Sequence, residues 1–108
     1  MAKSATGKRM FNCDANTVYA LVLKAVAEMK GVSVKSSDPG SRTIEAKSGV
    51  TLTSWGEAIS IRIVPVREDC CEVEVTSSSV LVTTLIDYGK NQSNVDKIFQ
   101  TLAYMVGT

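Results

Sequence analysis

The residue types that most often do chemistry in proteins are sparse in this chain of 108 residues. The chain has no histidine, which removes the commonest general base and the commonest metal ligand. The serine run at residues 77–79 therefore has no imidazole to activate it, and the acidic residues are scattered. We find no phosphate-binding glycine motif. These observations predict that the chain is not an enzyme.

The cysteines give no site either. An odd number of them, Cys13, Cys70 and Cys71, with two adjacent, is not the pattern of a disulfide framework. They also lack the CxxC spacing of a metal site. We predict two buried thiols and one exposed thiol, with no metal and no cofactor. A Cys13–Cys71 disulfide could form only in an oxidising compartment.

One group of residues is a candidate binding site. Tracing the expected strand directions brings several loops to one end of the sheet, beside Lys30 and Gly31. An aromatic pair, mixed charges and a helix N-terminus can together hold a small anionic ligand or a loop of a partner. In the simpler interpretation the two aromatic residues only close the end of the core. The candidate residues are Trp55, Glu57, Tyr88, Lys90 and Asn91.

The clearest element is a β-hairpin over residues 59–76. Isoleucines at 59, 61 and 63 alternate with polar residues, and so do valines at 73 and 75, as in half-buried antiparallel strands. Aligning the apolar faces places Ile63 opposite Val73. The same register places Arg62 opposite Glu74 on the solvent face, which is a favourable pair.

Two amphipathic helices are expected. The first has Asp14 as its N-cap, an apolar stripe at three- and four-residue steps, and Gly31 just past its end. The second is expected to begin at Ser93, with Asp96 three residues on as in a capping box. Its apolar stripe ends before Gly107.

The remaining strands are expected at residues 8–13, 32–37 and 42–53. The last of these pairs with the hairpin if Leu52 lies opposite Ile59, which leaves residues 54–57 as a tight loop. The course of residues 80–87 stays open, because their alternation is poor.

The predicted fold is an α+β two-layer sandwich in the order β-α-β-β-β-β-α, a five-stranded antiparallel sheet with both helices on one face. A single domain spans residues 8–108 after a flexible tail at residues 1–7. This order resembles the TATA-binding-protein-like and helix-grip folds. Residues 54–57 (SWGE) and 86–91 (IDYGKN) are similar to segments of small bacterial domains of uncharacterised function.

Composition narrows the partners. A formal net charge of +1 argues against nucleic-acid binding. No apolar run reaches the roughly 20 residues that span a bilayer, and the start of the chain lacks the apolar region of a signal peptide. We therefore expect a cytoplasmic protein.

Two functions stay open. The first is a non-catalytic binding or interaction domain, whose partner is an unknown protein or small ligand. The alternative is a small-molecule or lipid carrier with a cavity between the C-terminal helix and the sheet. Its lining would be Ile61, Phe99 and Leu102, with Met29 adapting to the guest. A homo-oligomer through an edge strand is also possible.

Overall fold

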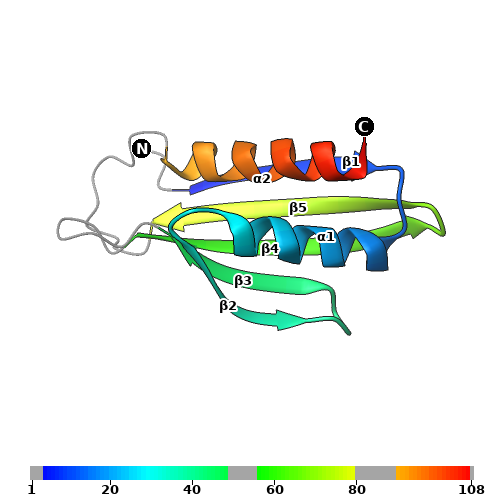
Figure 1. The fold of residues 1–108 in the computed structure, drawn as a ribbon, viewed down its shortest axis with the longest axis horizontal. Helices are drawn as coiled ribbons and strands as arrows, with labels where there is room; N and C mark the ends of the chain where they lie inside the picture. The colour runs from blue at the N-terminus through cyan, green and yellow to red at the C-terminus, as the bar shows by residue number, and fades with distance from the viewer. Residues whose placement is uncertain (1–3, 49–55, 80–89, 108) are drawn as a thin grey trace.

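The computed structural model describes residues 4–48, 56–79 and 90–107 (Figure 1). One antiparallel sheet forms a layer, and two helices lie side by side on it (Figure 1). This confirms the predicted fold class. The elements are β1 (Ser4–Phe11), α1 (Ala15–Glu28), β2 (Val32–Asp38), β3 (Thr43–Ser48), β4 (Glu57–Arg67), β5 (Cys70–Ser79) and α2 (Lys90–Val106).

The sheet has the strand order β1-β5-β4-β3-β2, so β1 and β2 are its edges. Ile63 pairs with Val73 and Arg62 with Glu74, as the alternation predicted. The predicted pairing of Leu52 with Ile59 is wrong, because Ala46 occupies the position opposite Ile59. Leu52 itself lies outside the described residues.

Both helices cover the same face of the sheet, and the core lies between the two layers. The isoleucines of β4 and the valines of β5 are buried against the apolar stripes of α1 and α2. The floor of this core consists of Ile59, Ile61, Ile63, Val73 and Val75, each at most 2% exposed. Burial of this continuous apolar surface is the main term that holds the helices to the sheet.

The helix ends agree only in part with the sequence. Asp14 is the N-cap of α1, and its carboxylate accepts a hydrogen bond from the Thr17 backbone N–H at 2.9 Å. The Thr17 contacts hold the pKa of Asp14 below its ordinary value. Gly31 has a positive φ of 78°, as a chain leaving a helix often requires. Helix α2, however, begins at Lys90 and not at Ser93.

The first strand is longer than predicted. It begins at Ser4, so the second half of the expected tail belongs to the sheet, paired with the last residues of β5. Helix α2 lies directly over this strand. A Cβ atom added to Gly7 would come within 2.7 Å of the Phe99 ring, so this close approach needs a glycine.

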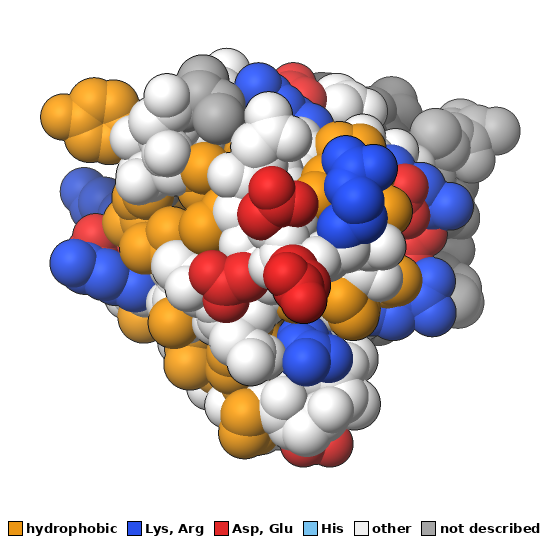
Figure 2. Space-filling model, turned by 90° about the vertical axis from the view of Figure 1, so that its right-hand side faces the viewer, with side chains coloured by type: hydrophobic (Ala, Val, Ile, Leu, Met, Phe, Trp, Pro, Cys, Tyr) orange, Lys and Arg blue, Asp and Glu red, His pale blue; other side chains and the backbone are white. Residues whose placement is uncertain are grey.

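The outer face of the sheet is polar. Glu74 pairs there with Lys8 at 3.5 Å and with Arg62 at 3.1 Å, and Ser60 donates to Glu45 at 2.7 Å. A shallow hollow of about 210 Å³ lies among these side chains. Figure 2 shows acidic and basic side chains interspersed at the end of the molecule where β4 turns into β5.

Within the described residues, neither helix combines the length and apolar character needed to cross a bilayer.

Candidate ligand-binding cleft

The inward side of the sheet changes character at one end. Along most of β3, β4 and β5 the side chains that face the helices are apolar. In the same alternating rows, at the ends of these strands, stand Ser48, Glu57 and Ser77, and all three are buried. Polar groups buried in this way need hydrogen-bond partners, because an unsatisfied group costs about 1–3 kcal/mol.

The partners come from the neighbouring strand and from α2. The Ser48 hydroxyl donates to Oε1 of Glu57 at 3.0 Å. The side-chain amide of Asn94 lies within hydrogen-bond distance of three acceptors, Ser48 and Glu57 at 3.3 Å and Ser77 at 3.1 Å. Asn94 thereby connects three strands to the helix above them.

A second asparagine continues the network one turn earlier in α2. Ser77 donates to Oδ1 of Asn91 at 2.8 Å, and the Asn91 amide donates to Ser79 at 3.2 Å. Asn91 is fully buried. Among the described residues, no buried side-chain polar atom lacks a hydrogen-bond partner. The first turns of α2 are therefore attached to the sheet by polar contacts and its later turns by apolar ones.

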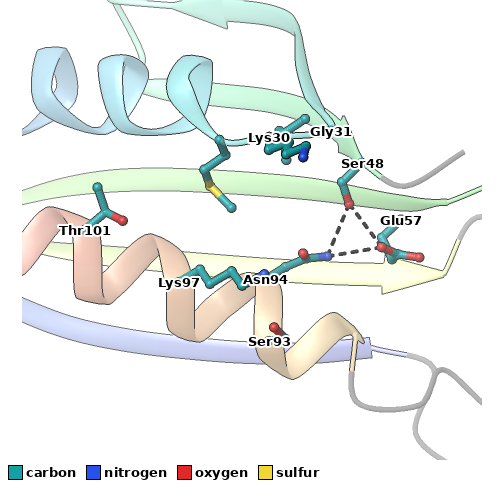
Figure 3. Close-up of a pocket in the computed structure, with 10 residues that line it drawn as sticks. Lys30, Gly31, Ser48, Glu57, Ser93, Asn94, Lys97 and Thr101 are labelled. Carbon is teal, nitrogen blue, oxygen red and sulfur yellow. Dashed lines mark hydrogen bonds between the residues drawn. The ribbon is translucent and has the colours of Figure 1, made fainter.

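A cleft of about 350 Å³ opens beside this network, between the end of α1 and helix α2. Figure 3 shows Lys30 and Gly31 on one side of it and Lys97 and Thr101 on the other. The hydrogen-bonded Ser48, Glu57 and Asn94 lie at the end of the cleft nearest the start of β4 (Figure 3). The half-buried Met29 and Val32 add apolar surface.

The charges in the cleft are unevenly distributed. Lys30 and Lys97 are exposed, whereas Glu57 is only 5% exposed. The hydrogen bonds to the Glu57 carboxylate come from neutral groups, the Ser48 hydroxyl and the Asn94 amide. In the described part of the chain, the ion pairs are those of Glu74 on the opposite face of the sheet. The cleft thus combines a buried carboxylate with two exposed ammonium groups.

Of the five predicted site residues, the structure describes the side chains of two, and these two lie in different parts of the site. Glu57 lines the cleft together with Lys30, beside which the sequence placed it. Asn91 is in the buried network behind the cleft. Trp55, Tyr88 and the side chain of Lys90 lie outside the described residues, so their part in a site stays a prediction.

Sequence reasoning missed Ser48, Ser77 and Asn94. A signal for two of them was present, because Ser48 continues the inward row of Ala46 and Ser77 that of Val75. Extending the period of two would have marked both as buried polar positions. No local pattern marks Asn94, whose partners are distant in sequence.

The cavity predicted for a carrier differs from the cleft. Of its expected lining residues, Met29 lines the cleft. Ile61 and Leu102 belong to the packed core. The Phe99 ring lies against β1, stacked with Phe11 at a centroid distance of 6.5 Å. The apolar stripe of α2 is used to bind the helix to the sheet, so the hollow forms where that stripe becomes polar.

The thiols lie at the other end of the sheet from the cleft. Cys70 and Cys71 are buried and Cys13 is half-buried, and the described thiols are free. Burial, with smaller effects of Cys13 and Cys70, raises the pKa of Cys71 to about 11. A thiol that stays protonated at neutral pH is a poor nucleophile and a poor metal ligand. The described residues hold no group of three or more Cys, Asp or Glu side chains arranged for a metal.

No protein-family model matches this sequence, and no curated protein matches it either. Solved structures do resemble its fold. A START superfamily protein from Mycobacterium smegmatis has a TM-score of 0.70 at 10% identity, over 98% of each chain. Norcoclaurine synthase from Thalictrum flavum, in complex with dopamine and hydroxybenzaldehyde, has a TM-score of 0.66 at 8% identity, over 96% of this chain and 86% of that one. The di-domain ARO/CYC BexL from the BE-7585A biosynthetic pathway has a TM-score of 0.59 at 15% identity.

The fold is that of START-like, helix-grip proteins. This supports the helix-grip half of the predicted resemblance, and the TATA-binding-protein-like half less specifically. The match to the ARO/CYC protein spans 97% of this chain but only 44% of that di-domain protein. At these identities the likeness concerns the fold alone.

The comparisons overturn one prediction from the sequence. We excluded catalysis because the chain lacks histidine and a nucleophile–base pair. A synthase and an aromatase/cyclase both adopt this fold, so the exclusion does not hold. The physical reason is that a cleft with a carboxylate and amines can do acid–base chemistry without histidine.

Proposed function

We propose that this chain binds a small organic molecule in the cleft between the end of α1 and helix α2. The observation that carries the proposal is the convergence of Glu57, Lys30 and Lys97 on one hollow of about 350 Å³. Small-molecule sites typically enclose about 300–1,000 Å³ and combine apolar walls with a few fixed polar groups. The cleft has both features.

The polar groups around Glu57 are held in place. Glu57 is fixed by Ser48 and Asn94, and Asn94 is in turn held against Ser77. Groups fixed before a ligand arrives bind it better, because less conformational entropy is lost on binding. The fold supports the same function, since one structure of similar fold contains dopamine and hydroxybenzaldehyde.

A pair of neighbouring substitutions on α2 tests the proposal. Thr101 lines the cleft and Gln100 is exposed beside it. A Thr101→Trp side chain would fill the cleft, whereas Gln100→Trp adds the same ring outside it. We expect native mass spectrometry of gently purified protein to show a bound small molecule on the wild type and on Gln100→Trp, and none on Thr101→Trp. Equal occupancy of all three proteins would contradict the proposal.

A further inference from the structure

Resting on the function proposed above, we infer that the ligand of this cleft is zwitterionic. Its ammonium group binds Glu57, and its acidic group binds Lys30 and Lys97. The ligand therefore belongs to the chemical class of amino acids with separated amine and acid groups.

The first argument is the state of Glu57. The residue is only 5% exposed, yet among the described residues its carboxylate is bonded to a hydroxyl and an amide and to no cation. Buried carboxylates are normally paired with a positive charge, because desolvation of an unpaired one is costly. Among the described residues, neither Lys30 nor Lys97 forms an ion pair with it. A ligand ammonium group supplies the missing charge.

The second argument is the position of the lysines. Lys30 follows the end of α1 and Lys97 is on α2, so they stand on opposite walls of the cleft (Figure 3). Two ammonium groups that face one hollow repel each other and favour an anion between them. Both lysines are exposed, whereas Glu57 is buried. The buried carboxylate and the exposed ammonium groups thus differ in depth, which matches a ligand whose amine is buried and whose acidic group stays near the surface.

The third argument concerns the apolar walls of the cleft. Met29 and Val32 line it and are half-buried, and Thr101 presents a methyl and a hydroxyl group. An unbranched thioether side chain adapts to ligands of different shape. The carbon framework between the two charged ends of the ligand therefore has apolar surface to pack against.

Three matched probes test this inference on the whole chain. 4-(Aminomethyl)benzoate carries both charges, 4-methylbenzoate only the acid, and 4-methylbenzylamine only the amine. Amide chemical shifts are followed while each probe is titrated. We expect the amides of Glu57, Asn94 and Lys97 to shift, and the zwitterion to bind about tenfold more tightly than either half, as one charge-assisted hydrogen bond allows.

Variants of the protein test which residue binds the amine of the probe and which binds its acid. In Glu57→Gln the advantage of the zwitterion over 4-methylbenzoate disappears, because the amide is isosteric but neutral. Glu45→Gln, on the opposite face of the sheet, keeps that advantage. If Glu57→Gln does not fold, Lys97→Gln gives the test from the other end. It weakens the acid and the zwitterion alike and leaves the amine unchanged, while Lys24→Gln on α1, outside the cleft, changes none of them.

The outcomes separate this inference from the proposed function. If 4-methylbenzoate shifts the cleft amides and binds as tightly as the zwitterion, the ligand class is wrong and the cleft still binds small molecules. The same conclusion follows if Glu57→Gln retains the advantage of the zwitterion. If none of the three probes shifts a cleft amide up to its solubility limit, both the inference and the proposed function fail.

Discussion

Ser77 on β5 donates a hydrogen bond of 2.8 Å to Oδ1 of Asn91 on α2, and both side chains are fully buried. The contact connects the last residues of β5 to the first turn of α2, the helix that covers this part of the sheet. Its neighbour Asn94 connects the same serine to Glu57 through one amide group. The position of the cleft wall therefore depends on a network in which serine and asparagine side chains surround the Glu57 carboxylate.

Replacing Asn91 tests how much this network stabilises the fold. Asn91→Ala removes the bonds to Ser77 and Ser79 and leaves the hydroxyls of the buried Ser77 and the half-buried Ser79 with fewer partners. We expect the free energy of unfolding to fall by about 1–3 kcal/mol, measured by urea denaturation. Gln92→Ala, which removes an exposed bond to Asp96, serves as the control and costs less. Equal losses would show that the buried bonds add nothing.

Gly7 tests the contact between α2 and the edge strand β1. An alanine Cβ there would lie 2.7 Å from the Phe99 ring and 2.9 Å from Val95, closer than van der Waals contact permits. We expect Gly7→Ala to destabilise the fold by about 1–3 kcal/mol. Thermal denaturation of a Phe99→Leu background provides the check, because the smaller side chain makes room. If the two losses simply add, the ring is not what excludes the Cβ.

The hairpin and the first helix were predictable because their signals are local and mutually consistent. On β4 and β5, one register satisfies both faces, with Ile63 opposite Val73 and Arg62 opposite Glu74. A shift of one residue would reverse the faces and was excluded by the pattern alone. The N-cap Asp14 likewise bonds to a residue only three positions away.

The register of β3 on β4 was not predictable in the same way. Shifting β3 along β4 by any even number of residues keeps the apolar side chains of β3 on the inner face. Leu52 and Ala46 are therefore equally good partners for Ile59 on the pattern alone. The register in the structure is the one that brings Ser48 beside Glu57 on the inner face and Glu45 beside Ser60 on the outer face. These are bonds between side chains on different strands.

The predicted start of α2 at Ser93 was wrong for a related reason. Ser93 with Asp96 has the spacing of a capping box, yet both lie inside the helix, where Asp96 accepts instead from Gln92. The first turn extends back to Lys90 and contains Asn91, whose partners are on β5. Tertiary contacts overrode the local signal, and the same distant contacts built the part of the site that the sequence did not reveal.

The buried thiol gives a prediction for alkaline pH. The pKa of Cys71 is about 11, against an ordinary value of 9.0, so the unfolded chain loses this proton first. The folded state then binds more protons than the unfolded state, and stability falls as the pH rises from about 9 to 11. We expect Cys71→Ala to be less stable at pH 7 but to lose less of its stability over that interval. An unchanged slope would contradict the assignment.

The outer face of the sheet is expected to contribute little to stability. Glu74 makes two ion pairs there, with Lys8 and Arg62, whose side chains are more than half exposed. Exposed pairs typically contribute about 0.2–1 kcal/mol and are screened by salt. Glu74→Gln should therefore lower the denaturation midpoint slightly at low salt and hardly at all at high salt. A large loss that persists in high salt would mean that this face is not exposed in solution.

The central claim is that the cleft between α1 and α2 is where this protein holds a small molecule. The most direct measurement is a crystal structure of protein soaked with 4-(aminomethyl)benzoate. We predict electron density for the compound in the cleft, its amine against Glu57 and its acid between Lys30 and Lys97. Density in the hollow on the outer face, beside Glu45 and Arg62, with the cleft empty, would contradict the claim.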